Sequence, residues 1–572
     1  MNSLLLAILM MVGYFIAYHT YGRFLGRKIF RIATENVCPS EALRDDQDFV
    51  PTNKHILFGH HFTSIAGLGP ILGPAIAIIW GWVPAVIWVF FGSIFFGAVH
   101  DFGTLVVSLR NQGRSIGDVA SDIVNKRVRT LFLLIIFFEL WIVIAVFALI
   151  IAILFTMYPQ AVIPVWFEIP LAVWLGYMVY KKGGNHVTLG ILAVVVMYIT
   201  VIIGAYVPID FKAMGLSAKG ALITWMVILF VYCYIASTLP VQALLQPRDY
   251  INSHQLFVAL GLLTIGAIVA HPTIIAPAFD AAPKGAPPVW PMIFVVIACG
   301  AISGFHSLVS SGTSAKQCRS ESDAQFVGYG SMLMEGTLSA LVIVAVAAGL
   351  GIGLVVKGGE TLTGAAAFSH HYASWSAAAG LGSKIAAFVS GSANLIESYG
   401  IPAKITITIM GVFLVSFAAT TLDTATRLQR YIIGELATAY NFTGAAKRHP
   451  ATLIAVITAF ILAFYNGSGK GALTLWPLFG TVNQLLAALA LLVVTIYLVR
   501  KKVPSVYTAI PMLFMIIMTG WAMIINLQKF FATSNWLLFV IGLIVFALEI
   551  WMIIESIAVY KQVSSQEAPA TV

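Results

Sequence analysis

Histidines and hydroxyl side chains precede glycines and prolines in one strongly apolar stretch of the chain. The stretch GHHFTSIAGLGPILGP covers residues 59–74, inside a longer run from His55 to His100 that contains no Asp, Glu, Lys or Arg. Glycine and proline weaken a helix interior, and backbone groups freed in hydrocarbon must find partners or line a cavity. The candidate ligands of a small polar substrate in this stretch are His61, Thr63, Ser64, Gly67 and Gly69.

A second stretch, GAISGFHSLVSSGTSAK at residues 300–316, repeats these residue types. Gly300 and Gly304 interrupt an apolar segment just before a histidine and several serines. Paired glycine-interrupted segments in two inverted halves point to a transporter's binding site near the bilayer midplane, whereas a tightly packed kink is the structural alternative. The candidate ligands here are His306, Ser307, Ser310 and Ser311.

Ionisable side chains inside apolar segments need a chemical reason, because an unpaired charge there is costly. A buried carboxylate can bind and release a proton near neutral pH, as proton coupling requires. Alternatively, a buried acid pairs with a neighbour and only locks two helices together, which is the role we expect of Glu549. The candidates for ion or proton coupling are His100, Asp101, Glu139, Glu335, Thr420, Thr421 and Asp423.

No catalytic constellation accompanies these residues. The chain has no HExxH motif, and the adjacent His60 and His61 would point about 100° apart on a helix. Its four cysteines show no CxxC spacing, so neither a zinc site nor a disulfide framework is indicated. We therefore expect no catalytic residue, no metal site and no cofactor, and a protein that is not an enzyme.

Membrane-spanning helices must position these side chains. Of the 572 residues, 60% are hydrophobic and 10% are charged, whereas a soluble domain carries about 25% charged residues. This composition predicts an all-α polytopic membrane protein with about 15 transmembrane helices, each of about 20 residues. The apolar runs long enough to cross a bilayer lie near 3–21, 56–80, 82–108, 130–157, 165–181, 186–206, 221–240, 254–272, 291–312, 325–356, 402–422, 450–465, 473–499, 505–526 and 534–560.

The basic residues indicate an orientation. With the N-terminus outside and the C-terminus inside, 24 of the 32 Lys and Arg residues fall in inner loops, as the positive-inside rule predicts. The net charge of +9 therefore reflects topology, and we expect no nucleic-acid partner. The outer side keeps eight lysines: Lys212, Lys219, Lys284, Lys357, Lys384, Lys404, Lys470 and Lys529.

One transporter domain, residues 1–560, accounts for nearly the whole chain, with a first half at 1–290 and a second half at 291–560. Three further segments are distinguished by composition. We expect a re-entrant or surface segment outside at 361–400, an amphipathic helix along the inner face at 425–447, and a disordered inner tail at 561–572.

The longest motifs resemble those of a known family. The stretches GHHFTSIAGLGPILGPAIA, FGAVHDFGTL, SGFHSLVSSGTSAKQ, TTLDTATRLQRY and LWPLFGTVNQLLAALAL together look like the carbon starvation protein A family, over about residues 1–500. The resemblance implies a bacterial inner-membrane secondary transporter linked to uptake of peptides or pyruvate when carbon is scarce. It also implies a LeuT-like fold of inverted repeats, with broken helices at 56–80 and 291–312 and cation-binding hydroxyls at Thr420 and Thr421.

We expect a secondary importer of a small carboxylate-bearing nutrient that works by alternating access with proton coupling. An unwound helix and the N-terminus of a half-helix favour a carboxylate, which pyruvate and peptides share. The residues leave open peptide or pyruvate as substrate, H⁺ or Na⁺ as coupling ion, and the oligomeric state. A membrane nutrient sensor that binds without net transport is the alternative from another class.

Overall fold

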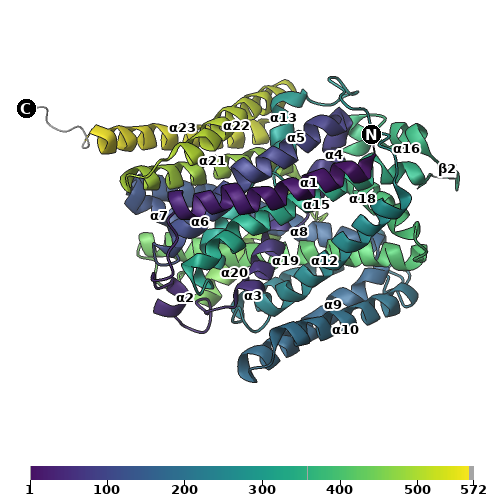
Figure 1. Ribbon diagram of the computed structural model, residues 1–572, viewed down its shortest axis with the longest axis horizontal. Coiled ribbons are helices and arrows are strands. Elements are labelled where there is room, and N and C mark those ends of the chain that lie inside the picture. Colours follow the sequence, from purple (N-terminus) through teal and green to yellow (C-terminus); the bar gives the residue numbers. More distant parts are fainter. Residues whose placement is uncertain (1, 357, 566–572) are drawn as a thin grey trace, which may run out of the picture.

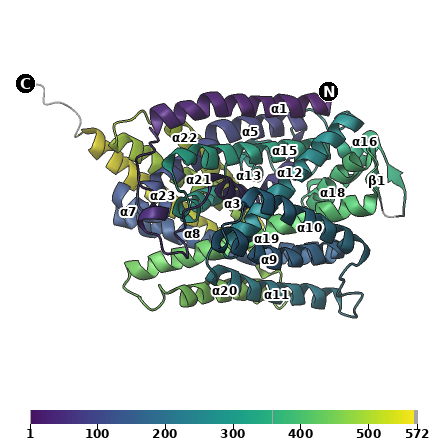
Figure 2. The ribbon, with the colours of Figure 1, turned by 60° about the horizontal axis from the view of Figure 1, so that its bottom comes forward.

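The computed structural model describes residues 2–356 and 358–565, and these are almost entirely helical. Within this part of the chain, the strands are β1 (Leu354–Val355) and β2 (Thr361–Leu362), which pair antiparallel as a small hairpin. Long helices run alongside one another through the whole molecule, as Figures 1 and 2 show. The expected all-α polytopic architecture is therefore confirmed.

The described residues hold twelve helical segments long and apolar enough to cross a membrane, and one bent pair of helices that together pass the same test. The helices that form the twelve segments are α1 (Ser3–Ala17), α5 (Trp82–Gly92) with α6 (Ala98–Leu109), α8 (Lys126–Met157), α9 (Val162–Gly176), α10 (His186–Tyr206), α11 (Ala218–Thr238), α12 (Leu245–Ala270), α15 (Ser331–Ala347), α19 (Ala403–Ala439), α21 (Trp476–Arg500), α22 (Val506–Ala532) and α23 (Trp536–Ser565).

Two expected spans are broken, as their glycines predicted. The first consists of α3 (Lys54–Ala66) and α4 (Gly69–Ala77), which are bent by 42° at the break. The second consists of α13 (Val289–Val296) and α14 (Gly304–Gly312), separated by seven residues outside any helix. The remaining expected span, near 450–465, is the shorter apolar helix α20 (Arg448–Phe464).

The segments between the spans differ in part from the sequence-based expectation. The region 361–400 contains α16 (Gly364–His371), α17 (Trp375–Ala378) and α18 (Leu381–Glu397), and α18 packs against α4 and α15. Residues 425–439 form no separate surface helix, because they continue α19 and most of their side chains are buried. The expected tail begins as helix, since α23 extends to Ser565, and its residues 566–572 lie outside the described part. Two short helices, α2 (Pro39–Ala42) and α7 (Ile116–Ile123), complete the inventory.

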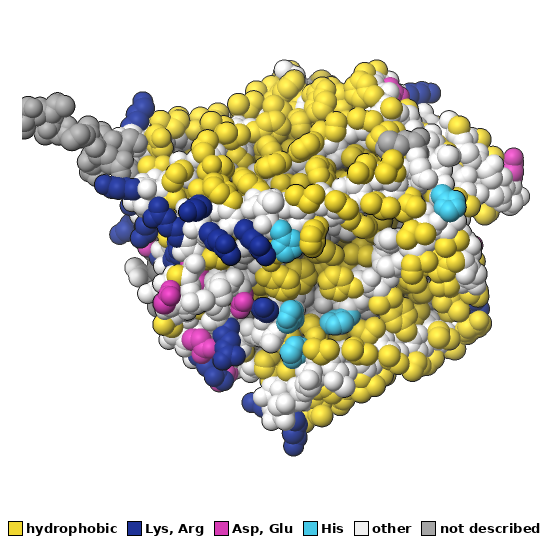
Figure 3. Space-filling view, in the orientation of Figure 1, with side chains coloured by type: hydrophobic (Ala, Val, Ile, Leu, Met, Phe, Trp, Pro, Cys, Tyr) yellow, Lys and Arg dark blue, Asp and Glu magenta, His cyan; other side chains and the backbone are white. Residues whose placement is uncertain are grey.

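The surface separates an apolar body from a basic end. Many large apolar side chains of α1, α10, α22 and α23 are exposed, as expected where lipid replaces water. Figure 3 shows Lys and Arg side chains gathered at the end that carries α2, α7 and the C-terminal helix. We call this the basic end; the N-terminus lies at the opposite end (Figure 1).

Candidate functional site

The two broken helices meet at their breaks. A Cβ atom on Gly69 would lie 2.2 Å from the sulfur of Cys299, and one on Gly73 would lie 2.6 Å from the carbonyl oxygen of Val296. Glycine is thus required for the unwound backbone of one span to approach that of the other. Two stretches that the sequence places more than 200 residues apart form one junction, which is where we had expected the substrate.

Local contacts hold each break open. Gly67 ends α3 with a φ of +45°, a left-handed conformation that favours glycine, and its missing side chain makes room for the hydroxyl of Thr421 on α19. At the second break, the Asn483 side chain from α21 accepts hydrogen bonds from the Ser303 hydroxyl at 3.0 Å and the Phe305 backbone N–H at 2.9 Å. A neighbouring helix therefore supplies the cap at the start of α14.

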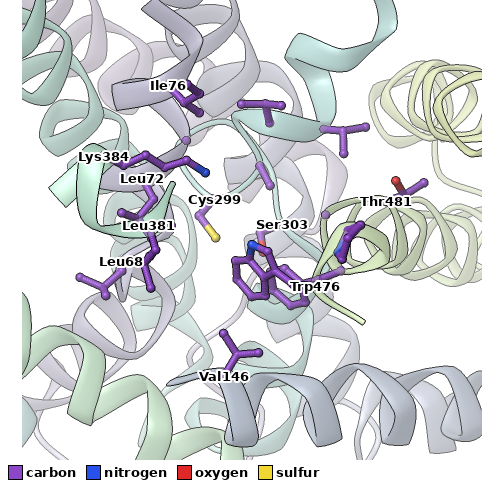
Figure 4. Close-up of a pocket in the computed structure, with 18 of the residues that line it drawn as sticks. Leu68, Leu72, Ile76, Val146, Cys299, Ser303, Leu381, Lys384, Trp476 and Thr481 are labelled. Atoms are coloured by element: carbon purple, nitrogen blue, oxygen red, sulfur yellow. The ribbon is translucent and has the colours of Figure 1, made fainter. Parts of the chain in front are cut away.

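A cavity of about 500 Å³ lies at the junction. Figure 4 shows its wall, formed by side chains of both broken helices, α8, α18 and α21. Pro287 and Lys529 also line it, and both belong to the end of the molecule opposite the basic end, because the 271–288 loop contacts Ser3 and Lys529 ends α22. The cavity thus extends from the breaks toward the end that carries the N-terminus.

Buried ionisable side chains cluster beside the cavity. Asp101 on α6 contacts His100 Nδ1 at 2.7 Å and His306 Nδ1 at 3.1 Å through its two oxygens. The other nitrogen of His306 lies 3.4 Å from a Glu335 oxygen on α15. Cys299, which lines the cavity, lies against this cluster, because its sulfur and donor atoms of His306 and Glu335 are all within 4.8 Å of one another. These three side chains also carry donor types that could converge on a metal ion.

Several atoms of this region have no hydrogen-bond partner among the described residues. They are Nε2 of His61, Nε2 of His100 and both carboxylate oxygens of Glu139 and Glu335, and all four side chains are fully buried. His61 uses its other nitrogen to contact the Ser314 hydroxyl at 2.7 Å. A buried polar atom without a partner is costly, so these atoms are candidates for contact with water, a proton or a bound molecule.

The polar groups lie on the basic-end side of the cavity. His61 precedes the cavity-lining Ile65 by one turn of α3, and Glu139 precedes the cavity-lining Val143 by one turn of α8. Both helices start at the basic end, so each polar residue is one turn closer to that end than the wall of the cavity. A layer of His and acid side chains thus separates the cavity from the basic end.

Asp423 belongs to a separate buried network of ion pairs and hydrogen bonds. Its Oδ2 accepts hydrogen bonds from Arg248 at 2.5 Å and from Tyr232 at 2.7 Å, and Glu168 lies 3.6 Å from the same guanidinium. Thr420 accepts a hydrogen bond from Asn252 instead of joining Asp423. The structure therefore places these residues in a buried ion-pair network on α9, α11, α12 and α19.

The sequence analysis missed part of this network. Arg248 was expected in an inner loop, but α12 starts earlier than the apolar run suggested and buries it. Its neighbour Asp249 contacts His60 Nδ1 at 2.5 Å, which ties α12 to the first broken helix. Ser64 joins the same region through the Thr424 hydroxyl at 3.0 Å. The sequence did contain a signal for this network, because Arg248 and Asp249 are adjacent opposite charges beside an apolar run.

Other candidate hydroxyls are used within their own helices. The Thr63 hydroxyl donates to the Gly59 carbonyl, the Ser307 hydroxyl to the Gly304 carbonyl, and the Ser311 hydroxyl to the Ser307 carbonyl. By contrast, the buried hydroxyls of Ser310 and Thr421 have no partner among the described residues, and Thr421 also lines the cavity.

A further ion-pair cluster lies at the basic end. The Asp48 carboxylate accepts hydrogen bonds from Arg427 at 2.7 Å, Arg430 at 2.8 Å and the Tyr431 hydroxyl at 2.7 Å. Burial disfavours the charge of Asp48, but the Arg427 and Arg430 guanidiniums hold the pKa of this carboxyl well below its usual range. The Lys316 ammonium lies 3.7 Å from the centre of the Tyr431 ring. These contacts join the loop before α3, the segment after α14, and α19.

Comparison with known proteins identifies the family. Residues 2–522 match the family described as Carbon starvation protein CstA. The chain belongs to the CstA family. A peptide transporter CstA from Campylobacter jejuni is 31% identical over 91% of this chain and 79% of its own length. A pyruvate/proton symporter, BtsT from Escherichia coli strain K12, is 30% identical over 89% of this chain and 80% of its own length.

Among solved structures, a manganese transporter from Eremococcus coleocola aligns with 90% of this chain and 99% of its own, at 12% identity and a TM-score of 0.43. The family relationship and the twelve apolar helical segments agree on a multi-pass membrane transporter.

Proposed function

We propose that the protein imports a small carboxylate-bearing nutrient by alternating access, driven by protons, in cells that are short of carbon. The observation that carries this proposal is the Asp101–His306–Glu335 cluster, which lies buried at the junction of the two broken helices and reaches the cavity through Cys299. Two relatives, a peptide transporter and a pyruvate/proton symporter, support both the substrate class and the coupling ion.

Substrate would bind in the cavity, where the breaks expose backbone groups and the Thr421 hydroxyl is free to donate. His61, Glu139, His306 and Glu335 would then carry the coupled proton through the polar layer toward the basic end. Two inverted halves, 1–290 and 291–560, would rock about the junction to open each side in turn.

The basic end is the cytoplasmic side in this proposal, because the positive-inside rule places Lys and Arg there. The N-terminus is then periplasmic, the C-terminus is cytoplasmic, and the membrane is the bacterial inner membrane. The cavity would face outward, while the Asp48 cluster closes the cytoplasmic side. Transport would require these ion pairs to separate.

Reconstitution in liposomes tests this proposal. Labelled pyruvate and, separately, labelled dialanine are offered with an inward proton gradient, with an inward sodium gradient and with neither, each with and without a chelator. We expect accumulation of one substrate with the proton gradient and no effect of the chelator. Accumulation with sodium alone would replace the coupling ion. Binding without accumulation under either gradient would favour a nutrient sensor.

A further inference from the structure

The charged side chains that line the cavity are of one sign. Among the described residues of its wall, Lys384 and Lys529 are charged, and no Asp or Glu lines it. Most of the remaining wall is aliphatic or aromatic, including Leu68, Leu72 and Trp476. A site of this composition offers an apolar surface and a positive charge, and no counter-charge for an amine.

Lys384 extends from the first turns of α18 into the cavity, near Leu72 and Leu381 (Figure 4). Within the part of the chain that the structure describes, its ammonium forms no ion pair. The position also opposes helix stability, because a cation near a helix N-terminus is repelled by the helix dipole. Lys384 therefore forms no salt bridge and does not stabilise its own helix. An anion bound in the cavity would pair with its charge and offset its repulsion by the helix dipole.

A second observation points to a ligand at the same place. The Thr421 hydroxyl lines the cavity, is 4% exposed and has no hydrogen-bond partner among the described residues. It lies against Gly67, at the first break, so it can donate to a carbonyl or hydroxyl oxygen of a bound molecule. A cation on one wall and a free hydroxyl on another suit a carboxylate with an adjacent oxygen.

We infer that Lys384 binds the substrate carboxylate, and that the cavity selects small monocarboxylates with a short apolar or carbonyl-bearing body over peptides. The inference rests on the proposed function, since it takes this cavity as the transport site. A peptide would bring an ammonium group that finds no carboxylate in the wall and is repelled by Lys384. Lys529, exposed at the end of α22, attracts the anion to the mouth of the cavity.

Equilibrium binding to the purified full chain tests the assignment without requiring transport. Labelled pyruvate is the probe, and unlabelled pyruvate, methyl pyruvate and dialanine are the competitors. The variants are Lys384→Met, which removes the charge, and Lys384→Arg, which keeps it. Lys470→Met is the matched control, because Lys470 is an exposed lysine of the same end that does not line the cavity.

We expect Lys384→Met to weaken pyruvate binding about tenfold or more, as for a lost charge-assisted hydrogen bond, while Lys384→Arg and Lys470→Met stay near the wild type. Neither methyl pyruvate nor dialanine should compete. Unchanged binding by Lys384→Met, equal competition by dialanine, or no pyruvate binding by the wild type would overturn the inference.

These outcomes are separable from failure of the proposed function. Lysine-dependent binding without gradient-driven uptake would leave the inference standing and overturn the importer. Proton-driven uptake of dialanine that Lys384→Met does not affect would overturn the inference and leave the importer standing.

Discussion

Gly69 and Cys299 lie so close together that a single methyl group on the glycine would fall 2.2 Å from the cysteine sulfur and 2.5 Å from its Cβ. These two residues belong to the two broken helices, so their contact fixes the distance between the breaks. The cavity and the ionisable cluster both depend on that distance, since Cys299 belongs to the wall of one and borders the other.

The first prediction concerns this contact. Gly69→Ala should lower the free energy of unfolding by about 1–3 kcal/mol, as overpacking does, and should abolish substrate uptake because the breaks must separate. The measurements are the thermal midpoint in detergent and uptake in liposomes. Gly382→Ala is the control, since nothing lies within 4 Å of a Cβ at that position. Normal uptake by Gly69→Ala would show that the junction tolerates a wider separation than we infer.

The second prediction concerns Glu335. Glu335→Gln keeps the shape of the side chain but removes a group that can carry a proton, so gradient-driven accumulation should be lost. Exchange of labelled for unlabelled substrate without a gradient should persist, because it needs no net proton movement. The control is Glu549→Gln, which changes a buried acid of α23, and it should accumulate substrate normally. If Glu335→Gln lost exchange and accumulation together, the carboxylate would be needed for binding or folding and not for coupling.

The third prediction concerns the closure of the basic end. Asp48→Asn leaves the buried Arg427 guanidinium, 1% exposed, without its carboxylate and should destabilise the protein by about 3 kcal/mol, at the low end for a buried pair. Asp46→Asn is the control, since its pair with Arg44 is largely exposed, at 57% and 58%. Thermal midpoints of the two variants would measure the difference.

The pH dependence of that difference has a definite sign. The folded-state pKa of Asp48 lies below its ordinary value of 3.8, so the carboxylate stabilises the fold above that value. This stabilisation is lost as the pH falls through the depressed pKa. The gap between wild type and Asp48→Asn should therefore be full at neutral pH and shrink in acid. A gap that is constant down to strong acid would show that Asp48 acts by shape and not by charge.

Local composition made the two breaks predictable, because glycine and proline inside apolar segments have few other uses. It also indicated Asp101 and Glu335 as costly ionisable groups and His306 as a candidate ligand, although it could not show that the three side chains lie together. The partner of Asp423 could not be read in this way, since Arg248 stands 175 residues away and had been assigned to a loop.

The same reason explains why Lys384 received no role from the sequence. It lies in a segment rich in small residues, and the cavity that it faces is built by side chains from distant parts of the chain. From the sequence alone, a lysine in such a segment is expected to lie in a loop on the outer side. Only the packing of α18 against α4 shows that it faces the cavity. Long-range packing, which no local pattern encodes, decided both cases.

The last prediction follows from the environment of Lys384, whose helix α18 is not among the candidate membrane spans. Burial lowers the pKa of this lysine to about 8. The charge that attracts a carboxylate is therefore full below this value and lost above it.

In equilibrium binding without a gradient, pyruvate affinity should stay constant up to about pH 7.5 and fall by up to about tenfold for each pH unit beyond the pKa. Lys384→Arg should keep its affinity through the same range, because a guanidinium stays charged. Lys529, the other charged residue of the wall, is exposed and is present in both proteins, so its contribution is the same on both sides of the comparison. An affinity that falls equally in the wild type and in Lys384→Arg would assign the pH dependence to another group and remove Lys384 from the carboxylate site.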